Sequence, residues 1–180
     1  MLDLINQALP ILTIAAQILI VLLIILLLFT RFGKTSNALT DFIKDNALII
    51  AFIVALVATL GSLFYSEIMG YEPCSLCWYQ RILMYPQVIL LGMAMVKRSV
   101  FIASYSIALS MVGGAIAAFH YYGQTVDNGV LSCDTLGQTA SCVTLFVLEY
   151  GYITIPMMAL TAFVFIILLM VSLKLYKKSS

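Results

Sequence analysis

Five long apolar runs follow one another along the chain, at residues 9–29, 47–66, 78–96, 100–121 and 152–173. Each holds about 20 residues, the length that an α-helix needs to cross a hydrocarbon core roughly 30 Å thick. Within lipid, a segment must satisfy its backbone N–H and C=O groups internally, so each run is expected to be helical. The 180 residues are 63% hydrophobic and only 9% charged, a composition that excludes a soluble domain. We predict a single all-α, polytopic membrane domain over residues 1–180, a bundle of five transmembrane helices.

The first run is expected to stay in the protein rather than to act as a cleaved signal peptide. Asp3 is the only charged residue before it, so the run lacks the basic segment that opens a signal peptide. It is also long for a signal sequence, and no clear small-residue cleavage site follows it. We therefore count it as a membrane span.

The basic residues predict the orientation of the bundle. Eight of the nine Lys and Arg fall in the loop after the first run, the turn after the third run and the C-terminal tail. Cytoplasmic loops carry an excess of Lys and Arg, so these three segments are expected in the cytoplasm. The N-terminus and residues 67–77 and 122–151 then lie outside. The ninth basic residue, Arg81, lies near the outer end of the third run.

All four cysteines fall in the two segments that this orientation places outside. Cys74 and Cys77 form a Cys-x-x-Cys motif at the mouth of the third run, and Cys133 and Cys142 lie in the later segment. Disulfides form and persist in extracytoplasmic compartments. Two dithiol pairs, one of them beside the bilayer, suit an electron relay based on thiol–disulfide exchange.

The spacing of the cysteines alone leaves other sites open. A c-type haem attachment needs His directly after the second cysteine, where this chain has Trp78. Four cysteines could also hold zinc, or could form structural disulfides. The extracytoplasmic position and the lack of flanking polar ligands favour redox chemistry, so we expect no metal.

Cys77 lies at the start of a predicted helix, where its thiolate form is favoured. The N-terminus of a helix favours an anion, and Arg81 follows Cys77 by four residues, on the same helix face. Both features stabilise a thiolate. Arg81 could instead anchor the helix at the lipid headgroups. His120, the only histidine, could be a hydrogen-bonded packing residue, or could donate to a quinone carbonyl or move a proton.

The segment that carries the first cysteine pair resembles a known family. Pro73-Cys-Ser-Leu-Cys-Trp-Tyr-Gln-Arg-Ile-Leu-Met-Tyr-Pro86 closely resembles the signature of the DsbB/BdbC disulfide bond formation proteins. Gly151-Tyr-Ile-Thr-Ile-Pro-Met157 is similar to the final span of that family. The resemblance covers residues 47 to the C-terminus and implies a four-helix bundle, to which residues 9–29 add an extra N-terminal helix.

The resemblance implies a function and roles for the residues. A reduced DsbA-like protein of thioredoxin fold attacks a Cys133–Cys142 disulfide at Cys133, and the electrons pass to Cys74–Cys77. Cys77 then reduces a membrane quinone, ubiquinone or menaquinone, in a bacterial cell (inner) membrane. The resemblance places Arg81, His120 and Gln80 near the quinone. Gln80 stands where some relatives have Glu.

Two other functions remain as alternatives. A relative of vitamin K epoxide reductase would also be a quinone-linked helical bundle with a Cys-x-x-Cys motif. A small transporter or membrane scaffold would use the disulfides only as structural links. Ionisable residues within the spans are confined to Arg81 and His120, near one end, which disfavours an ion pathway through the membrane. We expect no nucleic-acid partner.

Two local features carry further predictions. The small residues Gly113-Gly114-Ala115 in the fourth run allow close approach of another helix. The segment 143–148 is too short to span a membrane and too apolar for a free loop, so we expect it on the membrane surface as a short helix.

Overall fold

Five long helices make up the fold in the computed structural model, which describes residues 2–33, 38–97, 101–125, 142 and 145–179. The predicted all-α bundle of five helices is confirmed, and no strand occurs within these residues. In chain order the helices are α1 (Leu2–Gly33), α2 (Ala38–Leu63), α3 (Ser75–Lys97), α4 (Ile102–Thr125) and α5 (Ile155–Ser179). Helices α1 and α3 extend past both ends of their apolar runs, whereas α2 ends three residues before residue 66, and α4 and α5 begin two and three residues after residues 100 and 152.

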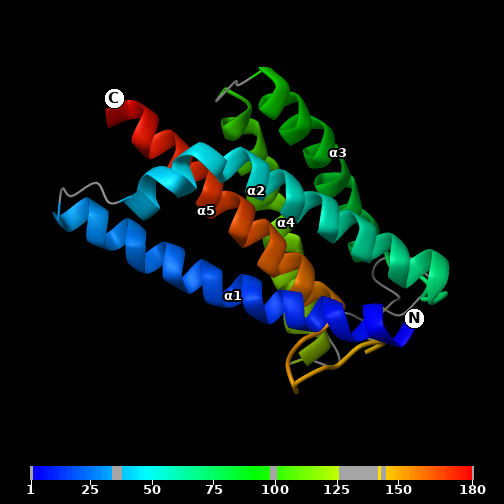
Figure 1. The fold of residues 1–180 in the computed structure, drawn as a ribbon. Helices are drawn as coiled ribbons and strands as arrows, with labels where there is room; N and C mark the ends of the chain where they lie inside the picture. The colour runs from blue at the N-terminus through cyan, green and yellow to red at the C-terminus, as the bar shows by residue number, and fades with distance from the viewer. Residues whose placement is uncertain (1, 34–37, 98–100, 126–141, 143–144, 180) are drawn as a thin grey trace.

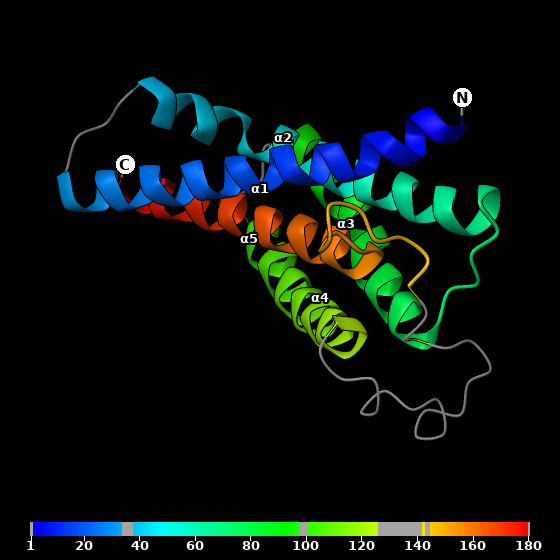
Figure 2. The ribbon, with the colours of Figure 1, turned by 90° about the horizontal axis from the view of Figure 1, so that it is seen from below.

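Helix α5 lies at the centre of the bundle and packs against α1, α2 and α4. Helix α3 packs against α2 and α4, on the opposite side of the bundle from α1 (Figure 1). The same arrangement is visible from below, where α1 runs along α5 (Figure 2). The core is formed where these helices meet and includes Phe163, Ile166 and Met170 of α5, which are fully buried.

Within the described residues, four stretches are long and apolar enough to cross a membrane, so the chain is a multi-pass membrane protein. Helix α3, with 23 residues, is long enough but less apolar, because its buried face includes Gln80, Arg81 and Gln87. Gln87 Oε1 accepts hydrogen bonds from the buried hydroxyls of Ser106 and Ser110 in α4, whereas Gln87 Nε2 has no hydrogen-bond partner among the described residues. The four apolar stretches are Asn6–Phe29, Asp45–Ile68, Ile102–Thr125 and Ile155–Leu175.

Two basic residues lie at the end of the bundle opposite the Cys-x-x-Cys motif. Lys97 ends α3, which begins one residue after Cys74. Lys174, near the end of α5, donates to Ser104 Oγ at the start of α4, over 3.1 Å. This separation agrees with the charge pattern, while the side of the membrane on which each end lies stays a prediction.

Gly113 lies where α4 packs closely on Phe163 of α5, which confirms the packing role predicted for the small residues of the fourth run. A Cβ atom at Gly113 would lie 2.4 Å from Cζ of Phe163, which is well inside van der Waals contact. A Cβ at the neighbouring Gly114 would lie 3.6 Å from Phe163 Cβ, an ordinary contact distance.

Gly113→Ala is therefore expected to destabilise the protein by about 1–3 kcal/mol, because the buried Phe163 ring must move to admit a methyl group. Gly114→Ala is the matched control and is expected to stay close to the wild type. Thermal unfolding of the two purified variants in the same detergent checks the difference. Equal melting temperatures would mean that Phe163 is free to repack.

A π-helical turn, η1 (Phe64–Ile68), ends α2 and shapes the site described below. The N–H of Met69 donates to the carbonyl of Phe64 over 3.0 Å, a step of five residues instead of four. Gly70 then adopts a φ of +71°, a left-handed conformation that suits glycine and stops the helix. The wider turn leaves Tyr65 buried, with only 4% of its surface exposed.

The segment after Cys142 differs from its prediction. Residues 145–148 do not form a helix; they lead into a tight turn closed by the bridge between Glu149 and Ile153. Val147 is buried against Phe64 and Tyr65, and the Phe146 ring stacks on Tyr71 at 4.9 Å. Of the apolar side chains that suggested a surface helix, Val147 is buried at the end of α2, whereas Leu145, Phe146 and Leu148 are exposed.

Candidate active site

The first cysteine pair lies at the start of α3. The carbonyl of Cys74 accepts a hydrogen bond from the Trp78 N–H over 3.1 Å, which begins the helix. Residues three apart share a helix face, so the Cys-x-x-Cys spacing brings the two sulfur atoms to 3.3 Å from each other. Cys74 is buried and Cys77 is half-buried. Both thiols are free in this structure.

The two thiols differ in acidity. The hydrogen bond between Cys74 and Cys77, together with burial, raises the pKa of Cys74 to about 11. The same hydrogen bond lowers the pKa of Cys77, which lies before the apolar part of α3, and the charge of Arg81 adds to this effect. Negative charge on the reduced pair therefore falls on Cys77, mainly because of its hydrogen bond with Cys74.

Cys142 lies against the first pair. Its side chain packs with Cys74 and Leu76, and its pKa is raised to about 11 by burial and by the contact with Cys74. The sequence predicts both pairs on one side of the membrane, but it does not predict the contact between Cys142 and Cys74. Cys133 lies outside the described residues, so the Cys133–Cys142 pairing stays a prediction.

His120 of α4 joins the two cysteine segments. Its Nε2 lies 3.1 Å from the carbonyl oxygen of Cys142 and 3.8 Å from Cys74 Sγ, and its Nδ1 lies 3.1 Å from Gln80 Nε2. A carbonyl only accepts, so Nε2 must carry the proton and Nδ1 accepts from the Gln80 amide. His120 is 1% exposed. Gln124, one turn further along α4, also donates to the Cys142 carbonyl, over 3.1 Å.

This geometry refines what the sequence suggested for His120 and Gln80. Both were considered as quinone contacts, and both line the cavity described below. Their hydrogen bonds, however, are to each other and to the cysteine segments. A neutral Nε2–H beside Cys74 can donate to a thiolate there, and this hydrogen bond lowers the pKa of Cys74 against the larger raising effects. A role at a quinone stays a prediction for both residues.

Arg81 is buried and fixed to the end of α2. Its Nε donates to Ser62 Oγ over 2.9 Å, and its Nη2 donates to the Ser62 carbonyl over 3.0 Å. The Trp78 ring lies over the guanidinium, with its centroid 5.2 Å from Cζ. A guanidinium has five N–H donors, so the two hydrogen bonds to Ser62 leave three without a partner among the described residues.

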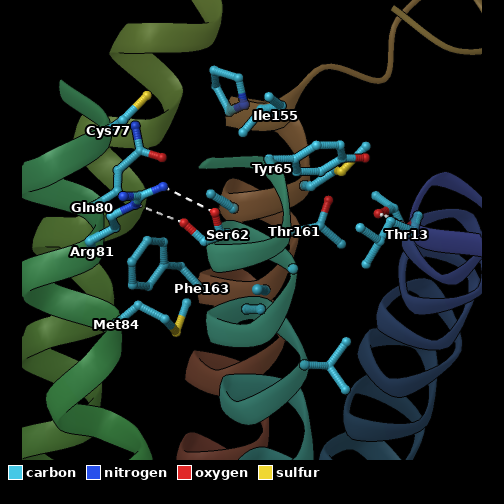
Figure 3. Close-up of a pocket in the computed structure, with 18 of the residues that line it drawn as sticks. Thr13, Ser62, Tyr65, Cys77, Gln80, Arg81, Met84, Ile155, Thr161 and Phe163 are labelled. Atoms are coloured by element: carbon cyan, nitrogen blue, oxygen red, sulfur yellow. Dashed lines mark hydrogen bonds between the residues drawn. The ribbon is translucent and has the colours of Figure 1, made fainter. Parts of the chain in front are cut away.

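An elongated cavity of about 420 Å³ opens beside these groups (Figure 3). One end is lined by Cys77, Gln80, Arg81 and His120, and the rest is lined mainly by apolar residues of α1, α2 and α5. Its volume falls within the range of about 300–1,000 Å³ that is typical of small-molecule sites. The mixture of one polar end and long apolar walls suits an amphipathic ligand.

Tyr65 is a cavity residue that the sequence alone does not reveal. Nothing in the sequence marks the π-helical turn in which Tyr65 lies. In the structure Tyr65 lines the cavity, and its buried hydroxyl has no hydrogen-bond partner among the described residues. A buried hydroxyl without a partner is costly, so a ligand oxygen would relieve it.

Cys74, Cys77 and His120 also meet a geometric requirement for a metal site, since their ligand atoms lie within 4.8 Å of one another. Both ring nitrogens of His120 already have hydrogen-bond partners, so a metal would have to displace one of them. Zinc would in addition need a fourth ligand in tetrahedral geometry. The hydrogen bonds therefore favour thiol chemistry over metal binding.

Comparison with known proteins assigns the family. A family model described as "Disulfide bond formation protein DsbB" matches residues 44–175, nearly three quarters of the chain. The chain belongs to the DsbB family. The DsbB match begins within α2 and takes in both described cysteine segments, but it leaves out α1. It agrees with the residues that suggested this family, and it supports thiol oxidation as the class of reaction.

Individual DsbB-family relatives are also similar. "Probable disulfide formation protein C 1" of Bacillus anthracis is 43% identical over 121 residues, which cover 67% of this chain and 86% of the relative. "Disulfide bond formation protein C" of Bacillus subtilis (strain 168) is 41% identical over 126 residues, 69% of this chain and 89% of the relative. No solved structure matches the chain.

Proposed function

We propose that this DsbB-family protein reoxidises an extracytoplasmic, DsbA-like protein of thioredoxin fold and passes the electrons to a membrane quinone. The observation that carries the proposal is the position of the Cys74–Cys77 pair. It touches Cys142 on one side and lines a cavity with a polar end and apolar walls on the other. Two thiol pairs and an amphipathic cavity in contact are the parts that such a relay needs.

The contact between Cys142 and Cys74 supports an order for the exchange. When the partner dithiol becomes a disulfide, it leaves Cys133 and Cys142 as thiols. The Cys142 thiolate then attacks Cys74 of a Cys74–Cys77 disulfide, so a Cys142–Cys74 bond forms and Cys77 leaves as a thiolate. A leaving thiol of low pKa departs faster, which fits the lowered pKa of Cys77. Attack by Cys133 on Cys142 then restores the Cys133–Cys142 disulfide and releases Cys74.

The reduced Cys74–Cys77 pair must next lose two electrons and two protons to become a disulfide again. A quinone, when bound, accepts both. The residues around the cavity suit such a group: Arg81 has N–H donors to spare, and Tyr65 has an unpartnered hydroxyl. His120 Nε2 lies 3.8 Å from Cys74 Sγ, and this contact helps to hold the neutral sulfur in place while Cys77 carries the charge.

The decisive experiment follows disulfide and quinol together. Purified protein is mixed, without oxygen, with a reduced DsbA-like protein and a soluble quinone, and both products are measured. We expect one quinol for each partner disulfide, because each exchange moves two electrons. A protein that forms partner disulfides without consuming quinone would contradict the proposal, and so would a protein that forms neither partner disulfide nor quinol. The second result would favour the scaffold or transporter alternative.

A further inference from the structure

Helix α1 forms one wall of the cavity, although it lies outside the region matched by the family. The cavity-lining residues of α1 recur at helical spacing, so they share one face of the helix. The packing of α1 on α5 presents this face to the cavity, and a hydrogen bond from Gln17 Nε2 to Thr161 Oγ1, over 3.3 Å, supports that packing. These residues are Leu9, Leu12, Thr13, Ala15, Ala16 and Leu19.

The apolar part of the cavity is long. Its lining extends from Tyr65 of η1 back along α2 to Ile50, a distance of fifteen residue steps, or about 22 Å at the helical rise of roughly 1.5 Å per residue. The facing α1 residues, from Leu9 to Leu19, are almost entirely apolar, and the hydroxyl of Thr13 is bonded to the Leu9 carbonyl over 2.9 Å. The α1 wall thus offers a ligand hydrocarbon contact and no free hydroxyl.

We propose that α1 binds the isoprenoid tail of the quinone and so makes this protein selective for long-tailed quinones. The inference rests on the proposed function, and it assigns a task to a helix that the family match does not include. The quinone ring lies at the Cys77 and Arg81 end, and its tail runs toward Ala16 and Leu19 between α1 and α2. Without α1, this stretch of α2 would face lipid.

A quinone fits the cavity better than the acyl chain of a lipid does. The apolar walls are continuous with an end that contains the Cys77 thiol, the buried guanidinium of Arg81 and the unpartnered Tyr65 hydroxyl. A phospholipid would bring a bulky, hydrated headgroup to this buried end. A quinone brings two carbonyl oxygens, which accept hydrogen bonds from these donors, and leaves nothing charged to be buried.

The test uses a bulky side chain on α1 to narrow the cavity. Ala16→Phe places a ring on the cavity face of α1, and Ala8→Phe places the same ring at an exposed α1 position that does not line the cavity. Each variant is titrated with a long-tailed and a tail-free quinone, and binding is read from thermal stabilisation and from the quinone extracted with the purified protein. We expect Ala16→Phe to weaken long-tailed quinone binding about tenfold, because tail contacts are lost.

Tail-free quinone is expected to bind Ala16→Phe as it binds the wild type, which also shows that the variant is folded. If Ala16→Phe does not fold, Leu19→Ala takes its place, since Leu19 is half exposed and its loss only removes wall contact. If Ala16→Phe binds the long-tailed quinone as tightly as Ala8→Phe does, the α1 inference is overturned, and the proposed function still stands. A wild type that no quinone stabilises would overturn both. If Ala16→Phe loses co-purified phospholipid but keeps its quinone, then α1 binds lipid, and the α1 inference is overturned.

Discussion

Replacing Cys77 by Ser should lower quinone-linked turnover by about a thousandfold or more, the largest effect expected of any single substitution in this protein. Cys77 is the half-buried thiol of the pair, and its lowered pKa makes it the thiolate of the reduced protein. A serine hydroxyl can neither form the Cys74–Cys77 disulfide nor leave as a stable anion. Quinol formation with a reduced DsbA-like protein measures the loss.

Disulfide mapping gives this variant a second readout. With Cys77 gone, Cys74 has only Cys142 in contact among the described cysteines. In Cys77→Ser the Cys74 thiolate should therefore attack Cys142 of the proposed Cys133–Cys142 disulfide, so that a Cys74–Cys142 bond accumulates and Cys133 leaves as a thiolate. Peptide mapping without reduction detects it. Cys77→Ser protein that retains rapid turnover, or that leaves Cys74 as a free thiol, would show that electrons do not pass through this pair.

The pKa values also predict how alkylation of the reduced wild type depends on pH. The pKa of Cys77 lies below the usual thiol value and that of Cys74 lies at about 11, so thiolate forms at Cys77 first as the pH rises. Iodoacetamide should therefore modify Cys77 well before Cys74 near neutral pH. The order of modification, read by mass spectrometry, checks that assignment independently of any partner or quinone.

The parts of the site that lie close together along the chain could be predicted from sequence. Cys74, Cys77 and Arg81 occupy successive turns at the start of one helix, so helical geometry alone puts them on one face. The five helices follow equally directly, because the bilayer requires long apolar runs and satisfied backbone groups. Local geometry and the solvent together decide these features.

Contacts between distant segments could not be predicted in the same way. The approach of His120 to Gln80 and Cys74 depends on how α3 and α4 are aligned, which is set by buried contacts such as Ser106 Oγ with Gln87 Oε1, at 2.7 Å. No local pattern encodes that alignment. The cavity position of Tyr65 likewise depends on the π-helical turn, which has no clear signature in the sequence.

The second large effect is expected at Arg81. Arg81→Met should weaken apparent quinone affinity by roughly ten- to a hundredfold, because a charge-assisted hydrogen bond contributes about 1.5–3 kcal/mol. Arg81→Lys should rescue only part of this loss, since an ammonium cannot hold Ser62 through a planar pair of donors and also reach a ligand. Steady-state turnover is measured against quinone concentration for each variant.

The structure supplies a control that separates binding from support of the fold. Ser62→Ala removes the hydroxyl that accepts from Arg81 Nε but keeps both the guanidinium charge and the Ser62 carbonyl bond, so its effect on quinone affinity should be much smaller. Oxidation of the partner in a single turnover without quinone should survive in Arg81→Met, because exchange through Cys142 comes before the quinone. If Arg81→Met and Ser62→Ala instead lose melting temperature together and keep a wild-type quinone dependence, then Arg81 serves to fasten α3 to α2. The donors for the quinone would then have to be sought at His120 and Tyr65.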